Sequence, residues 1–446
     1  MKKLGLMFLF AIFLFADILN NKNIEVLNAF DINDGFIENS KLQKLYKIYS
    51  KKKKEYFLNI LENGYDYLPL IKQSVLKSEV PKELVSVAMA ESYLTTSAKS
   101  HKRAIGLWQF IPKTAKRYGL KIDEYVDERK DPVKSTKAAI EYLSYLHRFF
   151  GKWYLAIMAY NAGEARIIES VVRAKIDKLC KSMGKKKCRN DKIIKGYRNI
   201  VKEYQKHGKY AFKKLYKLYL KLQNVPITLS ELMRFQKGLS RQYLPKETRK
   251  YILKILAMSF LFNSDDFIQY TNVYLLNSGI VSDLKKVDVP PGTSLFYVSK
   301  ILNIPYTEIR KYNLHLNYSF TPPYRYYIYI PYKKLAEFKL KFHPKQFFLV
   351  YKVKKGDTLG KIAKKFDTKV RIIEDFNELG KYLRIGQKII IPLNGVYVKY
   401  KVKKGDSLRK IAGKFGINYK KIMKVNELKS TTIRIGQILK IPQGLK

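Results

Sequence analysis

Cysteine is scarce in this chain, which has two, Cys180 and Cys188, among 446 residues. Two cysteines without a nearby histidine make a poor zinc site, and the sequence predicts neither a bound metal ion nor another cofactor. In an oxidising compartment the pair could close a small loop around Gly184 as a local disulfide; otherwise both would be free thiols. Neither state suggests catalysis by cysteine.

Long apolar runs are also missing, except in the first sixteen residues, which read MKKLGLMFLFAIFLFA. Two lysines followed by an apolar run that ends at Ala16 are typical of a secretory signal peptide, and the run is short for a membrane span. An uncleaved anchor is the alternative, because Leu14 is a large residue just before the expected cut. No cysteine follows Ala16 to carry a lipid. We expect a signal peptide at 1–16 and export to the periplasm or cell envelope.

Negative charge is in short supply, because 37 acidic residues stand against 88 basic ones and the formal net charge is +51. A surface of this charge attracts polyanions. Nucleic acid is the usual polyanionic partner, but an exported protein seldom meets it, so no nucleic-acid partner is expected. Anionic cell-wall polymer and an anionic membrane surface are better candidates. Biased codon usage is a second explanation, since the chain is rich in Lys, Ile, Asn, Tyr and Phe together.

The length and an apolar content of 46% fit a folded chain of two or more domains. Its carboxy-terminal third contains a repeat, YKVKKGDTLGKIAKKF and YKVKKGDSLRKIAGKF, within residues 351–393 and 400–442. In the first copy Gly356 precedes Asn377 by 21 residues, and the second copy keeps this separation. The spacing predicts a third, degenerate copy at 287–331.

Each of the two good copies follows one plan. A short alternating strand meets a Gly-Asp-Thr or Gly-Asp-Ser turn that also caps a helix. One face of this helix is apolar in both copies, through Leu359, Ile362, Ala363 and Phe366 and through Leu408, Ile411, Ala412 and Phe415. A second helix and a strand that ends in Ile-Pro complete a small β-α-α-β module.

These modules resemble the LysM domain, which binds glycans that contain N-acetylglucosamine, such as peptidoglycan. The resemblance covers residues 349–393 and 398–443, whereas the degenerate copy has Thr293 in place of the aspartate of the turn. In the family the sugar lies between the first strand–helix loop and the second helix–strand loop. The resemblance therefore implies these glycan-binding residues: Gly356, Asp357, Thr358, Arg384, Ile385, Gly386, Gly405, Asp406, Ser407, Arg434, Ile435 and Gly436. Linking such weak modules raises their effective concentration on a repeating polymer.

Upstream of the modules, residues 65–262 are rich in helical patterns and predict one helical domain. We expect a polar helical segment at 17–64 before it and a linker at 263–286 after it. One helix is defined by its ends, since Asp131-Pro132 provides a cap and first turn and Gly151 provides a stop. The residues that this helix turns inward are Ile140, Leu143, Leu146 and Phe150.

Another helix carries an unexpected carboxylate. It begins near Pro81, and its apolar face continues through Leu84, Val87 and Ala88. The next position of the same face is Glu91. An acidic side chain is rarely left on a core-facing position without a partner, so Glu91 is either a structural ion-pair or cap partner or a functional group.

Three further segments place polar residues in apolar surroundings, namely GLWQFIP at 106–112, LAIMAYNAGEARI at 155–167 and LPKETRKYI at 244–252. Together with the Glu-Ser pair, in this order, they resemble the lysozyme-type lytic transglycosylases of glycoside hydrolase family 23. The insertion at about 170–240 is longer than is usual in that family. The resemblance implies a mainly α, lysozyme-like catalytic domain, so the whole chain is predicted to be an α+β multidomain protein that ends in β-α-α-β modules.

The position of Glu91 fits a general acid. A glutamate with an ordinary pKa of about 4.3 has mostly lost its proton near neutral pH, whereas an apolar helix face raises that pKa. Ordinary glycosidases use two carboxylates, but Glu91 is the only one convincingly placed among these motifs. A single acid/base fits a reaction in which the substrate provides its own nucleophile.

The resemblance implies that reaction, which is cleavage between N-acetylmuramic acid and N-acetylglucosamine with the muramoyl C6 hydroxyl closing a 1,6-anhydro ring. Glu91 would donate a proton and then accept one. The resemblance also implies a substrate-binding set: Ser92, Gln109, Tyr160, Asn161 and Tyr251. The serine and glutamine would orient the carboxyl or the substrate, and the asparagine would hold an N-acetyl or hydroxyl group. The tyrosines would line the cleft, Tyr251 near the developing positive charge.

Other functions remain open on the sequence. A hydrolytic muramidase of lysozyme type would need a second carboxylate or a positioned water, and its product would carry a free reducing end. A wall-binding protein with a decayed catalytic half would bind peptidoglycan without cleaving it, although the intact motifs argue against decay. A basic nucleic-acid binder would show salt-sensitive binding to DNA. The expected partner is the glycan strand of peptidoglycan, with the protein associated with the cell wall.

Overall fold

The structure is a computed structural model of the chain. It describes residues 18, 20–52, 54–264, 283–343, 348–366, 368–377, 379, 383–392, 398–414, 418–426, 428 and 430–441. The predicted signal peptide lies outside the described residues, as does most of the predicted linker at 263–286. None of the described helices is long and apolar enough to cross a membrane.

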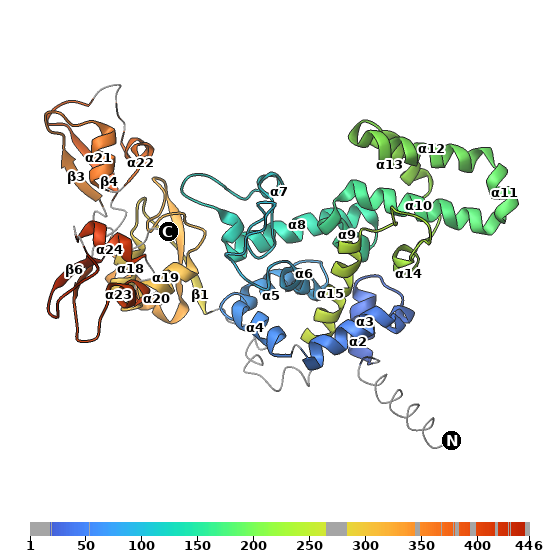
Figure 1. Ribbon diagram of the computed structural model, residues 1–446, viewed down its shortest axis with the longest axis horizontal. Helices are drawn as coiled ribbons and strands as arrows, with labels where there is room; N and C mark the ends of the chain where they lie inside the picture. The colour runs from blue at the N-terminus through green and yellow to red at the C-terminus, as the bar shows by residue number, and fades with distance from the viewer. Residues whose placement is uncertain are drawn as a thin grey trace, which may run out of the picture. The chain divides into compact units, whose positions relative to one another are not determined.

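The chain forms two compact units, each made of two segments. The first consists of Met1–Thr114 and Pro132–Ile280, and the second of Ala115–Asp131 and Val281–Lys446. Helices make up the first unit, whereas pairs of short antiparallel strands with two helices between them recur in the second (Figure 1). The predicted class, a mainly α domain followed by small β-α-α-β modules, is confirmed.

The amino-terminal half of the first unit consists of short helices. Isolated helices of this length are marginal in water, so packing of their apolar faces must hold them. In chain order they are α2 (Asn21–Ala29), η1 (Asp34–Glu38), α3 (Ser40–Lys47), η2 (Ile48–Lys52), α4 (Lys54–Gly64), α5 (Leu68–Leu76), η3 (Lys82–Leu84), α6 (Val85–Ser92) and the first half of α7 (Pro112–Arg117), whose second half belongs to the second unit.

Longer helices make up the rest of this unit. They are α8 (Pro132–Phe150), α9 (Trp153–Ala162), α10 (Glu164–Met183), α11 (Lys185–Asn190), α12 (Lys192–His207), η5 (Gly208–Tyr210), α13 (Phe212–Lys221), α14 (Leu229–Met233) and α15 (Lys246–Phe262). The predicted ends of α8 are confirmed. Of the residues it was expected to turn inward, Leu143, Leu146 and Phe150 are buried and Ile140 is half-buried.

Helix α15 is the centre of the first unit. It packs against α3, α6 and α9. Its side chains Ile252, Leu256 and Phe260 are almost fully buried. A helix that is apolar on most of its faces belongs in a core, so α15 brings the segments on either side of the insertion together.

The amino-terminal segment at 17–64 belongs to the same core. Its helices α2 and α3 pack against α15. Asp31, which follows α2, accepts hydrogen bonds from the backbone N–H of Trp153 at 2.8 Å and from Lys152 at 3.3 Å. The segment is therefore tied to the start of α9.

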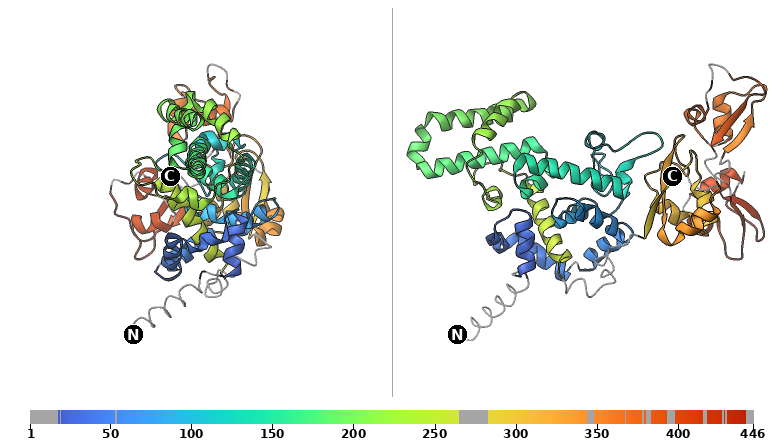
Figure 2. Two further views of the ribbon diagram at one scale, coloured as in Figure 1. Left: turned by 90° about the vertical axis from the view of Figure 1, so that its right-hand side faces the viewer. Right: turned by 180° about the vertical axis from the view of Figure 1, so that it is seen from behind.

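The insertion forms a helical hairpin in which α12 returns along α10, and α13 then reverses direction and packs against both helices (Figures 1 and 2). Helix α10 ends at Gly184, whose φ of 79° is costly for residues with a side chain. Cys180 and Cys188 form a disulfide across this turn. Of the two states that the sequence left open, the structure has the disulfide, and the loop that it closes is a turn between two helices.

The second unit begins with the degenerate module. Its strands β1 (Leu284–Val289) and β2 (Tyr326–Pro331) pair antiparallel, with Leu284 opposite Pro331. The module also holds α18 (Leu295–Ile301), α19 (Tyr306–Tyr312), η6 (Tyr332–Lys334) and α20 (Leu335–Lys341). It therefore extends beyond the predicted range of 287–331 at both ends, and β1 begins inside the predicted linker.

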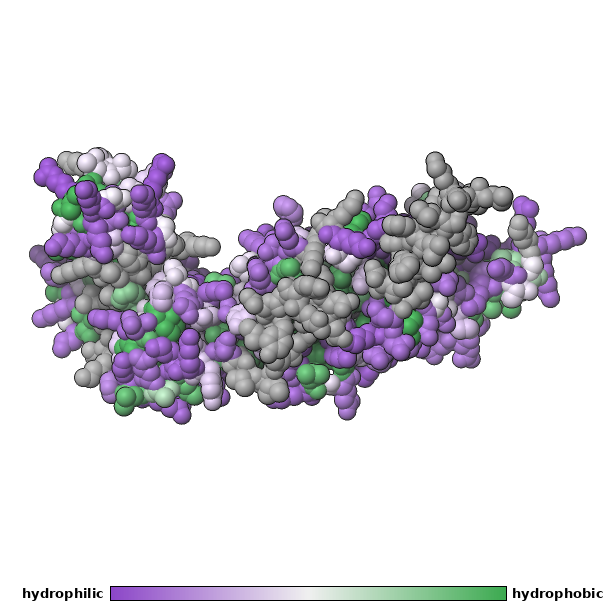
Figure 3. Space-filling view, turned by 90° about the horizontal axis from the view of Figure 1, so that it is seen from below, coloured by the Kyte–Doolittle hydropathy of each residue, from purple (hydrophilic) through white to green (hydrophobic). Residues whose placement is uncertain are grey.

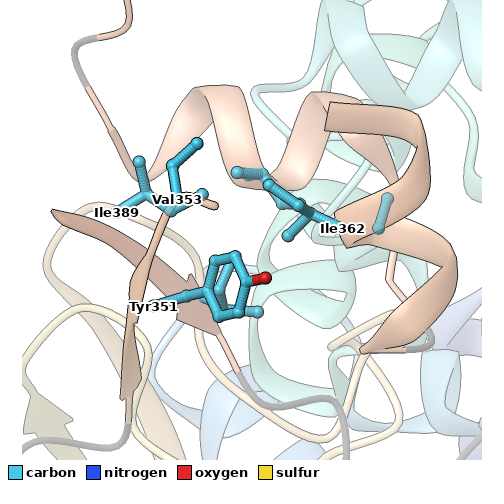
Figure 4. Close-up of a cluster of buried hydrophobic side chains, with 7 residues drawn as sticks. Tyr351, Val353, Ile362 and Ile389 are labelled. Atoms are coloured by element: carbon cyan, nitrogen blue, oxygen red, sulfur yellow. The ribbon is translucent and has the colours of Figure 1, made fainter. Parts of the chain in front are cut away.

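The two LysM-like repeats each form one strand pair and two helices. Their elements are β3 (Phe348–Lys352), α21 (Leu359–Lys365), α22 (Val370–Asp375), β4 (Lys388–Pro392), β5 (Val398–Lys401), α23 (Leu408–Lys414), α24 (Tyr419–Val425) and β6 (Ile438–Ile441). In the first repeat Tyr351, Val353, Ile362 and Ile389 face one another in a small apolar core (Figure 4). The second repeat has the same core.

The surface reflects the charge of the chain. On the face drawn in Figure 3, hydrophilic side chains surround scattered hydrophobic ones. Among the most exposed hydrophobic side chains are Tyr210 on the insertion and Ile385 and Ile435 on the repeats. Single exposed hydrophobic residues are ordinary, so only those in a loop expected to bind a ligand carry functional meaning.

Candidate active site

The last turn of α6 presents Glu91. After Pro81 the chain makes the short turn η3 and then α6, on which Val87 and Ala88 are fully buried. Glu91 continues their face and is half-buried. Burial raises the pKa of Glu91 to about 7, because a carboxylate loses hydration there. The predicted helix is thus present, with a half-buried acid on its apolar face.

Helix α15 supplies two groups that act on Glu91. The hydroxyl of Tyr251 donates a hydrogen bond to Glu91 Oε1 at 2.6 Å. Lys254, nearly one turn further along α15, donates to the carbonyl of Ala90 at 2.6 Å. Both groups lower the pKa of Glu91, against the larger effect of burial. Tyr251 was predicted and Lys254 was missed, although its place three residues after Tyr251 puts both on one helix face.

The predicted Ser92 connects two motifs. It is buried, and its hydroxyl donates to the carbonyl of Leu107 at 2.8 Å. The GLWQF turn is thereby fixed to the end of α6. Directly after Ser92, Tyr93 and Leu94 have φ values of 54° and 55°, which are strained for residues with side chains. Strain of this kind persists only where the surroundings hold it.

Gln109 sits in the turn itself with a φ of 49°. Its side-chain amide nitrogen donates to the carbonyls of Gly106 at 2.9 Å and Ala98 at 3.2 Å. The neighbouring Trp108 is fully buried and donates to Thr136 at 2.9 Å. These bonds hold the turn in one conformation, so the structure places Gln109 as a support of the turn.

Tyr160 closes the site from α9. Its hydroxyl donates to the carbonyl of Trp108 at 2.7 Å. Its ring lies 5.2 Å from that of Tyr142 and 6.2 Å from that of Phe110, between ring centroids. Burial raises the pKa of Tyr160, and the charge of Glu91 adds to that rise. The structure therefore places the predicted Tyr160 close enough to Glu91 for the charge of the carboxylate to affect the pKa of the tyrosine.

Asn161 is exposed next to Tyr160. Its Oδ1 accepts a hydrogen bond at 3.0 Å from the hydroxyl of Thr248, which is buried on α15. The contact fixes which way the amide faces. Thr248 lies in the segment LPKETRKYI but was not predicted as a site residue, because a partner 87 residues away along the chain has no local signal.

Glu91 stands alone among the described acids of this cluster. It is the only carboxylate among the described residues whose charge contributes to the raised pKa values of Tyr160 and Tyr251. No acid contributes to the shift of Glu91 itself. The described residues also contain no group of three or more His, Cys, Asp or Glu side chains that could hold a metal ion. The arrangement can donate and accept one proton at one carboxyl oxygen.

The loops of the repeats are built alike. The hydroxyl of Thr358 accepts from the backbone of Lys361, and Asp357 accepts from the Tyr351 hydroxyl at 2.8 Å. Ser407 and Asp406 have the corresponding contacts in the second repeat. The predicted aspartates therefore hold their own loops.

The second loop of each repeat offers an apolar side chain to solvent. The backbone N–H of Gly386 donates to Val353 at 2.8 Å, which places this loop beside the first one. Ile385 and Ile435 at the tips are each 70% exposed. Arg384 donates its backbone N–H to Gln387, and Arg434 and Gly436 repeat the same geometry.

The degenerate module differs at this position. Thr293 is fully buried and donates to the carbonyl of Pro290 at 2.8 Å. Its backbone N–H donates to the hydroxyl of Thr321 at 2.8 Å. A threonine hydroxyl thus takes over a turn that an aspartate holds in the other two repeats.

Comparison with protein-family models identifies the domains. Residues 69–179 match the transglycosylase SLT domain. Residues 351–392 and 400–442 match the LysM domain. Residues 283–342 match the LysM-like domain of lytic transglycosylase MltD. The chain thus carries an SLT domain followed by a LysM-like domain and two LysM domains, in agreement with the family resemblance of its motifs.

Particular relatives share the first of these regions. A stretch of 142 residues, 32% of the chain, is 34% identical to membrane-bound lytic murein transglycosylase D of Escherichia coli (strain K12) and covers 31% of it. A stretch of 110 residues, 24% of the chain, is 43% identical to a protein of Alteromonas sp. (strain M-1) named for tributyltin chloride resistance and covers 53% of it. The matches thus span about half or less of these relatives.

Among solved structures, the spore cortex-lytic enzyme SleL of Bacillus cereus is 29% identical over 22% of this chain and 23% of its own. The TM-score is 0.11, which is too low to support a structural comparison.

Proposed function

We propose that this protein is an exported lytic transglycosylase of peptidoglycan. It would cleave the β-1,4 bond between N-acetylmuramic acid and N-acetylglucosamine and leave a 1,6-anhydro ring on the muramoyl end. One observation carries the proposal, namely a single half-buried glutamate whose pKa is raised to about 7 and which accepts a hydrogen bond from Tyr251. The SLT and LysM matches support the substrate class.

Glu91 would act twice. Below its pKa of about 7 the carboxyl group still carries a proton, which it donates to the glycosidic oxygen as the bond to C1 breaks. The resulting carboxylate accepts the proton of the muramoyl C6 hydroxyl, whose oxygen forms the new bond to C1. The proton count closes and no water is consumed, so the second carboxylate of an ordinary glycosidase is not needed.

The other residues would prepare this exchange. The hydrogen bond from Tyr251 and the charge of Lys254 both favour the carboxylate, and both therefore stabilise the state that follows proton donation. Tyr160 would line the cleft beside the reacting sugars. Asn161, oriented by Thr248, would hold an N-acetyl or hydroxyl group of the glycan.

The LysM domains would anchor the enzyme to its polymer. Two linked modules of low affinity bind a repeating glycan more tightly than either alone. The net charge of +51 would add attraction to acidic wall polymer and to an anionic membrane surface. Export by the predicted signal peptide would place the protein in the cell envelope.

The product of the reaction tests the proposal. Purified peptidoglycan is incubated with the protein and with Glu91→Gln, and the released muropeptides are analysed by mass spectrometry. The protein should yield 1,6-anhydro products and the variant none. Glu164→Gln, at the first turn of α10, is the matched control and should behave as the parent protein.

Two results would overturn the mechanism. Products with free reducing ends would make the enzyme a hydrolase and would call for a second acid. Binding of peptidoglycan by both proteins without any product would leave a wall-binding protein.

A further inference from the structure

The insertion contains a cavity that the proposed reaction does not use. Its volume is about 520 Å³, and it lies between α10, α12 and the loop that precedes α15. Its charged lining is mainly basic and comes from Arg173, Arg198, Lys202 and Arg241, with Asp177 as the acid among them; Gln205 and Ser240 are its neutral polar residues. Four cations and one anion around a cavity of this size attract an anionic ligand.

Part of that positive charge is neutralised by a buried carboxylate, Glu169. Glu169 is fully buried, and Arg241 binds its two carboxylate oxygens at 2.8 and 2.5 Å. Arg166 and Arg173 lie 3.3 and 3.7 Å from the same carboxylate. The carboxylate of Glu169 holds these arginines in place. Positive charge remains in excess, because there are more cations at the cavity than the two acids, Glu169 and Asp177, can pair with.

Two cations at the cavity keep binding capacity. Lys202 is exposed and makes no hydrogen bond or ion pair within the part of the chain that the structure describes. Arg198 uses Nη2 for Cys180 Sγ at 3.3 Å and for Asp177 at 3.5 Å. The remaining donors of its guanidinium can form a fork for a planar carboxylate.

The apolar side chains of the lining are aliphatic. Ile176 and Val201 are buried, and Leu239 is 49% exposed at the opening. Burial of an aliphatic group against these side chains is favourable, whereas a strongly hydrated phosphate would gain nothing from them. The ligand should therefore carry a carboxylate beside a small aliphatic group.

We propose that this cavity binds an acidic peptide. Given the proposed function, on which this inference rests, the source is the short peptide attached to the muramoyl residues of peptidoglycan. Its carboxylates would contact Lys202 and Arg198, and its aliphatic side chains would contact Ile176, Val201 and Leu239. The insertion would then select glycan strands that still carry their peptides.

Calorimetric titration of the full chain tests the cavity without any cleavage. The probe is the synthetic peptide L-alanyl-γ-D-glutamyl-diaminopimelate, and the comparison is the same peptide with all of its free carboxyl groups amidated. Every titration uses protein with the Glu91→Gln substitution as its background. The acidic peptide should bind, and the amidated one should bind about tenfold more weakly, because hydrogen bonds to charged groups are lost.

Lys202→Glu and Lys195→Glu make the same charge change on α12, but only Lys202 lines the cavity. Lys202→Glu should weaken binding about tenfold and Lys195→Glu less than twofold. Equal losses in both variants, equal binding of the amidated peptide, or no binding would overturn the proposal. Displacement of the peptide by inorganic phosphate or by phosphatidylglycerol vesicles would overturn it in favour of a phosphate ligand.

The proposed function can fail separately. Cleavage of peptide-free glycan strands by the parent protein measures the reaction alone, and Lys202→Glu should leave that rate unchanged. Peptide binding without 1,6-anhydro products would support the proposed ligand of the cavity and contradict the proposed reaction. Formation of 1,6-anhydro products without peptide binding would support the reaction and contradict the ligand.

Discussion

Glu91 is subject to two opposing influences that together set its chemistry. Burial on the apolar face of α6 favours the protonated form, whereas Tyr251 and Lys254 on α15 favour the carboxylate. Burial is the larger of these, so the pKa rises to about 7. A group that must first give and then take a proton is best served by a pKa near the working pH, where neither step is strongly uphill.

Removal of the Tyr251 hydroxyl should shift the pH dependence of cleavage. Activity that needs protonated Glu91 is present below the pKa and is lost as the pH rises through about 7. Tyr251→Phe removes a hydrogen bond that stabilises the carboxylate, so the alkaline limb should move up by about one pH unit. The rate should fall at the same time, because the carboxylate that follows proton donation is less stable. Initial rates measured from pH 5 to 9 report both effects.

The matched control is Tyr306→Phe, which removes a hydroxyl bonded to Ser319 in the second unit. The alkaline limb of the Tyr306→Phe profile should lie at the same pH as that of the parent protein. A Tyr251→Phe profile that is lower but not displaced would mean that the tyrosine is structural and does not set the pKa of Glu91.

The sequence identified the acid but could not supply its surroundings. Glu91 follows from helical periodicity, because one carboxylate interrupts an otherwise apolar face. Ser92 and Gln109 were predicted to orient the carboxyl or the substrate, and the structure shows their hydrogen bonds going to backbone carbonyls. Thr248 was missed, since it reaches Asn161 across the long insertion and no local pattern marks such a pair. Lys254 was missed although it shares a helix face with Tyr251.

A covalent link spans the turn between α10 and α11. Cys180 and Cys188 are separated by 8 residues, and their Cα atoms lie 5.1 Å apart, a distance that suits a disulfide. Arg198 of α12 donates to both sulfur atoms, so the link also positions one side of the cavity in the insertion. From the sequence alone the redox state of the two cysteines stayed open. Their spacing shows only that a disulfide can form, and the redox conditions of the compartment decide whether it does.

Loss of this disulfide should lower stability without stopping cleavage. Closing a loop of this length stabilises a protein by about 2 kcal/mol, mainly by restricting the unfolded chain. Cys180→Ser combined with Cys188→Ser should therefore lower the midpoint temperature at which the first unit unfolds by a few degrees in calorimetry. The parent protein should show the same decrease in reductant, and the double variant should not respond to it. A parent transition that ignores reductant would contradict the assigned role.

The repeats show which elements a pattern can predict. The two good copies follow from a shared turn, a fixed spacing and an apolar helix face, and their strand pairs and helices are confirmed. The degenerate copy was predicted too short. Its first strand reads LKKVDV, with a buried residue only at each end, so it lacks the alternation that marks a strand. Its last helix, α20, has no counterpart among the described residues of the other repeats and could not be expected from them.

The chain crosses between its two units more than once. Residues 115–131 lie inside the stretch that matches the SLT domain, yet they pack in the second unit. There the buried Asp131 accepts hydrogen bonds from Tyr327 and Tyr329, and the buried Glu128 accepts one from Tyr326. The LysM-like domain therefore supplies partners that two buried carboxylates of this loop need. These tyrosines satisfy hydrogen-bond acceptors of the loop, which no repeat pattern predicts.

Tyr327→Phe should test this dependence. A buried carboxylate that loses one of its donors costs about 1.5 to 3 kcal/mol, and the loss should appear as a lower transition of the second unit. Tyr332→Phe, on a side chain that is 53% exposed, is the control and should change little. Calorimetry of the full chain measures both. Equal transitions for the two variants would show that the loop does not depend on this hydrogen bond.

Wall binding should depend on both LysM domains together. Ile385 and Ile435 are the exposed apolar tips of corresponding loops, so an aspartate at either should remove apolar contact with a glycan without disturbing a core. Each single variant should weaken binding to purified sacculi about tenfold, and the double variant about a hundredfold, because linked sites multiply their affinities. Leu340→Asp, which makes the same kind of change on exposed α20, should bind normally. Co-sedimentation in the Glu91→Gln background, at low and high salt, distinguishes this mechanism from attraction by charge alone. If the basic surface provides the affinity, the double variant will bind like the parent at low salt, and both will be released together as the salt screens the charges.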